Sequence, residues 1–308
     1  MNHDHKRQRI GRISLMGGAV IAAAAVVAGC GGSSPAHSKS GTGTTRSQTT
    51  NPDLVLARAA DASTAAVGSK IGIVMHETVD GQSIDLTGAG SVSAAKRTAD
   101  MTMHIGGSAL AGQGTMTLQV VLDKGTIYMK MPASVAGRLP GGKPWLSINT
   151  AQIAKAAHIR GYGSMLNSSS SITNPGQYLA FLDGVASGGV KNLGQATVNG
   201  VATTHYRANV DLGKLMTAVP AKEKPAIKAI VTTLRQRGNV THLPIDVWID
   251  HSNLVRRVQL AYSMTVDGKA VSTHVTENLS DYGPQPAPTP PSASQVTDLG
   301  ALLGRSTS

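Results

Sequence analysis

The chain of 308 residues contains a single cysteine, a single phenylalanine and two tryptophans, and aromatic residues make up only 3% of it. One cysteine excludes an internal disulfide. Single-stranded nucleic acids are bound by aromatic side chains interleaved with basic ones, so the scarcity of aromatics argues against a nucleic-acid partner. The apolar volume must come from Val, Ile, Leu, Ala and eleven Met. Flexible methionine side chains define the packing of a core less well than aromatic rings do. This composition therefore favours an interior that is not fully packed.

A complete nucleotide-binding motif is also missing. Residues 137–143 match the first seven positions of a phosphate-binding P-loop. The eighth position is Pro144, where a Ser or Thr should hold Mg²⁺, and the residues from Trp145 onward have the pattern of a strand instead of a helix. We interpret this segment as a glycine-rich turn between strands.

No set of residues has the spacing of a metal site or a catalytic site. The histidines form no pair at i, i+4 around a Glu on a helix. We expect four of them to be surface side chains: His104, His205, His251 and His274. Four acidic residues fall in or near predicted strands without any spacing that pairs an acid with a base: Glu77, Asp85, Asp100 and Glu277. We therefore predict no enzyme activity, no cofactor and no metal.

The first 29 residues have the composition of a removable leader. Four basic side chains come first, at Lys6, Arg7, Arg9 and Arg12. An uncharged stretch of Gly, Ala, Val and Ile then runs from Gly17 to Ala28. This stretch is too short to span a bilayer, but it has the length of the apolar region of a signal peptide.

The leader ends in the sequence Val27-Ala28-Gly29-Cys30, with small residues directly before the cysteine. Lipoprotein signal peptidase requires this arrangement, and the thiol receives a diacylglyceryl group before cleavage. Two acyl chains anchor a protein stably where one does not. We predict cleavage before Cys30 and anchoring, through its lipid, at the extracytoplasmic face of the cell membrane. The alternative is an ordinary secretory signal that ends at a chance cysteine.

Composition divides the remaining chain into three parts. Residues 30–50 are rich in Gly, Ser and Thr, and we expect a disordered tether. Residues 51–283 carry strand signals without an internal linker, which predicts one domain. Residues 284–308 form a Pro-rich C-terminal tail. Within it we expect Gln295 to Leu303 to be frayed, with one or two docked helical turns as the alternative.

Strict alternation of apolar and polar residues predicts strands over most of the domain. The segments that alternate are 71–75, 84–87, 101–105, 116–120, 127–131, 243–249 and 258–266. Turn signals separate them at Asp80-Gly81, Asp123-Gly125, Asn199-Gly200 and Asp267-Gly268. Short connections of this kind join consecutive antiparallel strands. We predict a long meander that forms one large curved antiparallel sheet.

Helical signals accompany these strands. Asn51-Pro52-Asp53 predicts the start of a helix that runs to about Val67. Further helices are expected from Thr150 to His158, from Asn174, and from Lys222 to Arg237. A sheet with one apolar face must be covered, because a monomer rarely leaves so much apolar surface exposed. The predicted fold class is therefore α+β, with helices over the concave apolar face of the sheet.

Methionines recur on the apolar side of the predicted strands. Ordinary core packing is the simpler interpretation, and an adaptable lining for acyl chains is the functional one. The residues expected to line such a cavity are Met75, Met101, Met103, Met116, Leu118, Met129, Met131, Ile245, Val247, Leu260 and Met264. The net charge of +11 fits anionic headgroups or wall polymers as partners, although a solvated basic surface explains it as well.

The chain resembles the LolA/LolB-like lipoproteins, in particular the actinobacterial LppX/LprG-type group. The resemblance covers about Asn51 to Tyr282, in addition to the leader and the Ser/Thr-rich tether. Within the domain it rests on Pro144 to Ile148, Tyr178 to Leu182, Val198 to Val201 with Thr204 to Tyr206, and Leu243 to Asp250 with Leu254 to Arg257. These segments are marks of a fold, and none is a ligand contact.

The resemblance implies a half-open β-barrel with helices across its mouth and an apolar cavity that holds the acyl chains of lipids or glycolipids. It implies carriage of such lipids within the cell envelope, without covalent chemistry, and an envelope transporter or acceptor protein as a partner. The alternative is a structural or sensory lipoprotein with a filled core that acts through a membrane partner protein. The sequence names neither the lipid nor the direction of transfer.

Overall fold

The computed structural model describes residues 51–110, 114–137, 141–149, 189–218, 228, 231–266 and 268–299. Cys30 and the tether lie outside these residues. So do the helices predicted from Thr150 and from Asn174, and half of the residues of the helix predicted from Lys222 to Arg237.

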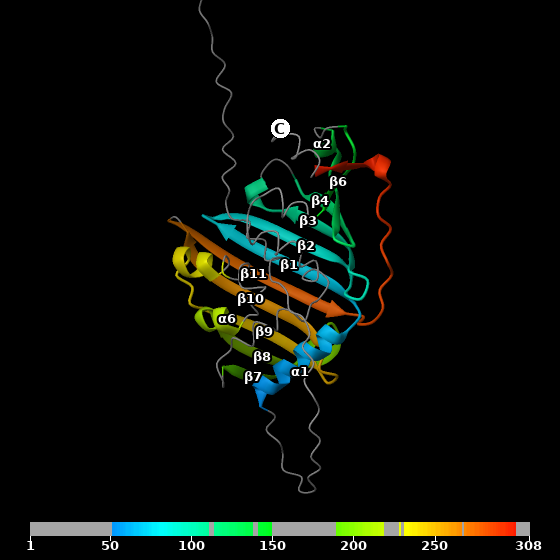
Figure 1. Ribbon diagram of the computed structural model, residues 1–308. Coiled ribbons are helices and arrows are strands. Elements are labelled where there is room, and N and C mark those ends of the chain that lie inside the picture. Colours follow the sequence, from blue (N-terminus) through cyan, green and yellow to red (C-terminus); the bar gives the residue numbers. More distant parts are fainter. Residues whose placement is uncertain are drawn as a thin grey trace, which may run out of the picture.

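Twelve strands of the described chain form one open sheet (Figure 1). In spatial order they are β12 (Val296–Asp298), β6 (Trp145–Asn149), β5 (Thr126–Lys130), β4 (Met116–Asp123), β3 (Thr98–Gly106), β2 (Gln82–Ser93), β1 (Ser69–Val79), β11 (Lys269–Ser280), β10 (Val255–Val266), β9 (His242–Asp250), β8 (Val201–Asp211) and β7 (Val190–Val198). All neighbours pair antiparallel except β12 and β6, which are parallel. The predicted α+β class, with a large curved antiparallel sheet, is confirmed.

The meander has two parts that meet at its first and last long strands. Strands β1 to β6 follow one another across one half of the sheet, and β7 to β11 across the other. The two halves join where β1 pairs with β11, from Lys70 opposite Ser280 to Val79 opposite Val271. A continuous sheet therefore depends on contacts between residues about two hundred positions apart.

Tight turns fix the register of the hairpins, as the sequence predicted. Asp80 and Gly81 have φ values of 53° and 80°, and Asn199 and Gly200 have values of 49° and 82°. Two-residue turns with positive φ at both positions match the twist of antiparallel strands, and Asx-Gly pairs tolerate that conformation best. Because the turns fix the register, apolar side chains of neighbouring strands lie on the same face of the sheet.

Helices cover one side of the sheet over strands β7 to β10. Helix α1 (Pro52–Ala65) begins as predicted, because Asn51 Oδ1 accepts a hydrogen bond of 3.0 Å from the N–H of Asp53. Helix α6 (Leu212–Ala218) and the π-helical turn η3 (Thr233–Arg237) lie on the same side (Figure 1). The short segments η1 (Ser108–Leu110), α2 (Ala133–Ala136) and η4 (Ala293–Gln295) lie in connections.

The hydrophobic core lies between these helices and the sheet. Leu56 and Ala59 of α1, Leu212 and Leu215 of α6, and Leu234 of η3 are all buried in one cluster with strand residues. Those strand residues include Tyr206, Ala208, Ile245, Val247, Val258 and Met264. We call the side of the sheet that faces this cluster the inner face, and the opposite side the outer face.

A buried carboxylate organises the turn between β9 and β10. Asp250 accepts hydrogen bonds from the N–H groups of Ser252 and Leu254 at 2.8 and 2.9 Å, and Arg256 donates to its other oxygen at 2.7 Å. The guanidinium of Arg256 also lies over the ring of Tyr282, 5.4 Å from its centroid. The carboxylate thereby links this turn to the segment that follows β11.

The same region ties helix α1 to the sheet. The N–H of Val255 donates to the hydroxyl of Ser63 in α1 at 3.1 Å, and the hydroxyl of Tyr282 donates to the carbonyl of Val255 at 2.5 Å. Burial raises the pKa of Tyr282 above its ordinary value, so the phenol keeps its proton and remains a donor.

The segment after β11 corrects one prediction. The expectation of a frayed segment from Gln295 is wrong at Val296–Asp298, because these residues form β12 beside β6. Lys143 reinforces the contact by donating to the carbonyl of Val296 at 3.0 Å. Three residues are too few for alternation to be recognised, so the sequence carried no signal for this strand.

Candidate functional site

The candidate site is the inner face, where the register brings the predicted cavity residues together. Residues directly opposite one another on neighbouring strands lie on the same face. One row runs from β4 to β9 through Met116, Ile105, Leu86, Met75, Val275, Leu260 and Ile245. The next row runs through Leu118, Met103, Gly88, Ile73, Glu277, Val258 and Val247.

Two further rows include the other predicted residues. Met129, Val120, Met101, Gly90, Ile71 and Leu279 form one, and Met264, Val271 and Val79 form the other. Met131 follows directly after β5 and donates its N–H to the carbonyl of Pro144 at 2.9 Å. Ten of the eleven predicted residues thus share one face of the sheet, with Met131 beside it. Whether they enclose a cavity stays a prediction.

Burial differs between the two halves of this face. Under α1, α6 and η3, Ile245, Val247 and Met264 are buried. On β3 to β5, Met103, Leu118 and Met129 are only half-buried, although they face the same side. The main contacts of α1, α6 and η3 with the sheet lie on β7, β8 and β10. The methionine-rich half therefore retains apolar surface that the described helices do not fill.

Two glycines of β2, Gly88 and Gly90, leave the inner face without a side chain opposite Met103 and Met101. A Cβ at Gly88 would lie 3.6 Å from the side chain of Met103 and 3.7 Å from that of Met101. The thioether chains thus lie over a position that has no side chain of its own. At Gly90 a Cβ would lie only 2.0 Å from the carbonyl oxygen of Asp100, so this position admits glycine alone.

The inner face also carries two carboxyl groups that the sequence did not place there. Glu77 and Glu277 are each 4% exposed. Both occupy the apolar phase of their strands, Glu77 two residues after Met75 and Glu277 two residues before Leu279. Their alternation with Met75 and Leu279 was the sequence signal that could have placed both carboxyl groups on the inner face. Burial raises the pKa of Glu77 above its ordinary value, because the charged form loses hydration.

The outer face carries a ladder of polar and aromatic side chains. His205 stacks on Trp248, with ring centroids 4.1 Å apart, and Arg257 lies 5.7 Å from the centroid of the same ring. Asp246 accepts from His205 at 2.6 Å and from Arg207 at 2.9 and 3.0 Å. The other three histidines expected at the surface are exposed, whereas His205 is half-buried in this ladder. Since both sides of the indole are covered, the ladder is structural.

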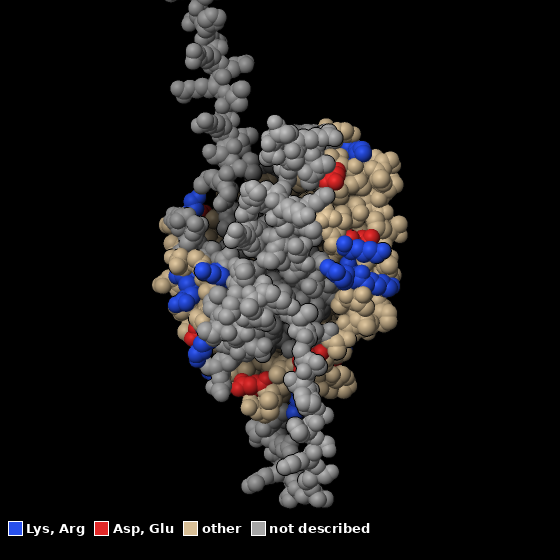
Figure 2. Space-filling model, viewed as in Figure 1, with Lys and Arg blue, Asp and Glu red and all other residues tan. Residues whose placement is uncertain are grey.

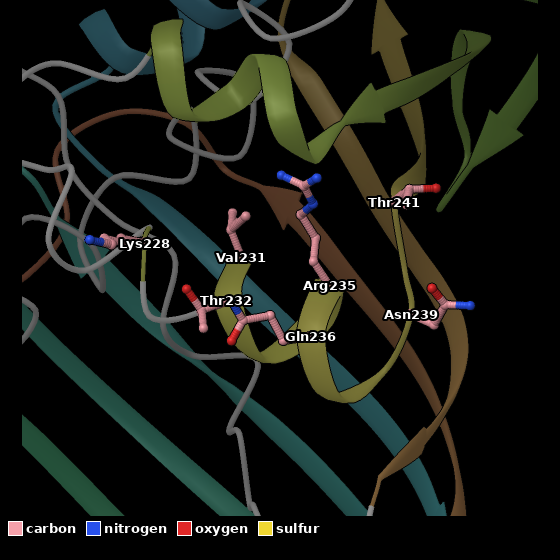
Figure 3. A pocket seen from close by; sticks show the side chains of 7 residues that line it. All are labelled: Lys228, Val231, Thr232, Arg235, Gln236, Asn239 and Thr241. Atoms are coloured by element: carbon pink, nitrogen blue, oxygen red, sulfur yellow. The ribbon is translucent and has the colours of Figure 1, made fainter.

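Two hollows lie in the described part of the molecule, and polar residues outnumber apolar ones in the lining of each. One of about 480 Å³ lies beside η3, between Lys228, Arg235, Gln236, Asn239 and Thr241 (Figure 3). In Figure 3 the side chain of Arg235 rises from η3 toward α6. The other, of about 730 Å³, is a trough on the outer face beside Gly72 and Ala89. Neither hollow is lined by the closely spaced large apolar side chains that enclose acyl chains.

Basic side chains gather at one end of the sheet. Lys70, Lys96, Arg97 and Lys124 are exposed where β1 and β3 begin and where β2 and β4 end. Figure 2 shows the largest visible group of Lys and Arg side chains at the right-hand margin, with few acidic side chains beside it. Lys70 pairs with Asp281 at 2.7 Å. This end of the sheet is suited to contact with an anionic surface.

Within the described ranges, no group of three or more His, Cys, Asp or Glu side chains could hold a metal ion. The same residues include no helix of the length and apolarity needed to cross a membrane. In the segment that resembles a P-loop, Gly137 and Gly141 lie in turns and not in a helix. Strand β6 begins at Trp145, as the sequence predicted.

Comparison with known proteins adds relatives but no family model, since none matches the chain. A protein of Streptomyces griseus, described as an uncharacterized 31.2 kDa protein in the rplA–rplJ intergenic region, is 28% identical over 190 residues. The alignment covers 62% of this chain and 59% of that protein. The chain thus spans about three fifths of the length of this relative.

Solved structures resemble the fold at low identity. LprF from Mycobacterium bovis gives a TM-score of 0.44 at 15% identity, covering 78% of this chain and 97% of that one. The Mycobacterium tuberculosis lipoprotein LppX gives 0.40 at 14% identity, with 77% and 97% covered. A LolA superfamily protein from Nitrosomonas europaea gives 0.23 at 6% identity, with 77% and 95% covered. These names match the LolA-like, LppX-type family that the sequence resembles. At such identities the likeness concerns the fold alone.

Proposed function

We propose that this protein is a membrane-anchored extracytoplasmic lipoprotein that binds acyl chains of lipids or glycolipids against its inner face and carries them within the cell envelope. One observation carries the proposal. On the methionine-rich half of the inner face, Met103, Leu118 and Met129 are apolar yet only half-buried, whereas Met101 beside them is buried. Methionine side chains adapt to guests of irregular shape because their thioether chains are unbranched and flexible.

The energetics of lipid extraction explain why such a face is useful. Each CH₂ group moved from hydrocarbon into water costs about 0.8 kcal/mol. A sixteen-carbon acyl chain therefore costs about 12 kcal/mol on leaving a bilayer, and a two-chain lipid about twice that. A protein surface that reburies the chains removes most of this cost. No covalent step is needed for such a role.

The anchor at Cys30 places this face beside the source of its ligand. The leader and the small residues before Cys30 support lipidation, and the Gly/Ser/Thr-rich residues 31–50 support a flexible tether. The basic end of the sheet supports an orientation toward anionic headgroups. Labelled palmitate should be incorporated into the wild-type protein and not into Cys30→Ser, which should leave the membrane fraction.

Lipid extraction provides the test of acyl-chain binding. The purified protein is extracted with organic solvent, and the released lipids are quantified by mass spectrometry. Leu118→Trp fills the half-buried part of the inner face, whereas Thr117→Trp adds the same ring to the outer face of the same strand. We expect the first variant to release several-fold less lipid than the second. Equal release from both variants, at equal thermal stability, would show that the lipid binds elsewhere.

A filled interior would produce a different outcome. If the wild-type protein releases no lipid beyond that attached to Cys30, the carrier proposal fails. The alternative from the sequence, a structural or sensory lipoprotein that acts through a membrane partner, would then take its place.

A further inference from the structure

Three polar side chains form a row across the largely apolar inner face. Glu77 on β1 lies directly opposite Thr273 on β11, and Thr273 lies directly opposite Tyr262 on β10. These strands are neighbours in the middle of the sheet (Figure 1). With strands about 4.8 Å apart, the row spans about 10 Å. We call these three residues the polar row.

Apolar rows flank the polar row on both sides. Toward the middle of the strands lie Met75, Val275 and Leu260, and toward the hairpin ends lie Val79, Val271 and Met264. The polar row is therefore not part of a wet strand end. It interrupts an apolar surface close to one of its margins.

Two members of the polar row, Glu77 and Thr273, are buried without a hydrogen-bond partner among the described residues, and Tyr262 is half-buried. Glu77 is 4% exposed and Thr273 is fully buried. The hydroxyl of Thr273 has no hydrogen-bond partner. Among the interactions of the described chain, Glu77 has neither a hydrogen bond nor an ion pair, only the electrostatic influence it exerts on Tyr262. Nearly all buried polar groups in proteins are hydrogen-bonded, and within the described residues this row lacks the partners that such groups ordinarily have.

Tyr262 completes the row as a donor. Burial raises the pKa of its phenol, and the nearby Glu77 raises it further, so the hydroxyl keeps its proton. The Thr273 hydroxyl is close enough to oppose this shift slightly, yet the two hydroxyls make no hydrogen bond of acceptable geometry. All three side chains thus retain hydrogen-bonding capacity toward the interior.

The composition of the row selects the chemistry of its partner. Two hydroxyls and a carboxyl group both donate and accept hydrogen bonds, as the hydroxyls of a sugar or glycerol do. No Lys, Arg or His belongs to the row or to the flanking rows, so nothing there compensates the charge of a phosphate. A second carboxyl, Glu277, lies on the same face. The site disfavours anions.

We propose that Glu77, Thr273 and Tyr262 bind the hydroxyl groups of an uncharged lipid headgroup, whose acyl chains extend over the methionine-rich part of the same face. The proposal rests on the proposed acyl-chain binding and adds the class of lipid. It also assigns an orientation, with the headgroup between β1 and β10 and the chains toward β3 and β4.

Displacement of a fluorescent acyl probe tests the proposal on the full chain. The protein is kept in lauryldimethylamine oxide, a detergent without hydroxyl groups, at one fixed concentration, so that its competition cancels from ratios. Three ligands with the same chain length are compared: monopalmitoylglycerol, methyl palmitate and hexadecyl phosphate. We expect monopalmitoylglycerol to bind about tenfold more tightly than either of the others, the effect of a net hydrogen bond or two.

Isosteric variants assign the preference to the polar row. Glu77→Gln, Thr273→Val and Tyr262→Phe should each reduce the preference for monopalmitoylglycerol several-fold while leaving methyl palmitate binding unchanged. Thr276→Val is the matched control, because Thr276 lies on the outer face of β11 and accepts a hydrogen bond from Gln259 at 3.0 Å. It should change neither affinity.

The outcomes separate the two proposals. Equal binding of monopalmitoylglycerol and methyl palmitate by the wild-type protein overturns the headgroup site but leaves acyl-chain binding intact. Tighter binding of hexadecyl phosphate also overturns it, in favour of an anionic headgroup. Failure of all three ligands to displace the probe, or of the probe to bind, refutes the proposed function itself. The comparison of ligands needs no variant, so poor folding of a variant cannot obscure it.

Discussion

Replacement of Asp250 by alanine should destabilise the protein more than any change to a surface ion pair. The Asp250 side chain is 1% exposed, and that of its partner Arg256 is 19% exposed. The variant leaves this guanidinium without its carboxylate and deprives the N–H groups of Ser252 and Leu254 of their acceptor. Removing one partner of a buried pair costs about 3–5 kcal/mol.

We therefore expect a loss of about 4 kcal/mol in the free energy of unfolding. At about 2–4 °C per kcal/mol for a domain of this size, the melting temperature should fall by about 8–16 °C. Asp250→Asn keeps an oxygen for the two backbone N–H groups and should lose about half as much. Circular dichroism during heating and urea titration measures both variants.

Asp85→Ala is the matched control. Its pair with His76 measures 2.5 Å, yet both side chains are about half exposed, so the pair is worth about 0–1 kcal/mol. If Asp250→Ala melts within the error of this control, the buried turn does not hold β9, β10 and α1 together as described. Hydrogen exchange should also rise in α1, because Ser63 depends on the same turn.

Three further predictions concern stability. Gly90→Ala places a Cβ 2.0 Å from the carbonyl oxygen of Asp100 and should cost at least about 1–3 kcal/mol, whereas Gly72→Ala, with 4.0 Å to its nearest neighbour, should melt like the wild type. Tyr282→Phe removes one hydrogen bond to the backbone and should cost about 1 kcal/mol in urea titration. The raised pKa of Glu77 means that the folded state holds this proton to higher pH than the unfolded state, so wild-type stability should fall as pH rises above about 4.5. Glu77→Gln should lack this part of the pH dependence, and identical profiles for the two proteins would contradict the burial of the carboxylate.

Much of the fold could be read from alternation and turn residues. The face of a strand follows from its apolar phase, so the methionines of β1, β3, β4 and β5 were placed together correctly. The pairing of β1 with β11 could not be predicted, because alternation identifies a face but not a partner strand. Lipidation of Cys30 stays a prediction, because Cys30 lies outside the described residues.

Strand β11 shows where this approach reaches its limit. Its inward positions include Thr273 and Glu277, which interrupt the apolar phase and conceal the strand from pattern recognition. Glu77 hides the end of β1 in the same way. Sequence patterns fail most often where local rules are broken for function. Glu77 and Thr273, which obscured the strands, are two of the three residues to which we assign headgroup binding.

In the described chain the open sheet has two edges, and they differ in how their backbone groups are protected from pairing with another strand. An unpaired edge invites β-pairing with another molecule, a route to aggregation. Strand β12 covers β6, whereas β7 is left without a second neighbour. There a register shift between Asn192 and Gly194, with φ of 103° at Gly194, breaks the line of free backbone groups beside the exposed Leu193. The bulge makes β7 a poor template for a foreign strand, so this edge resists pairing with a neighbouring molecule.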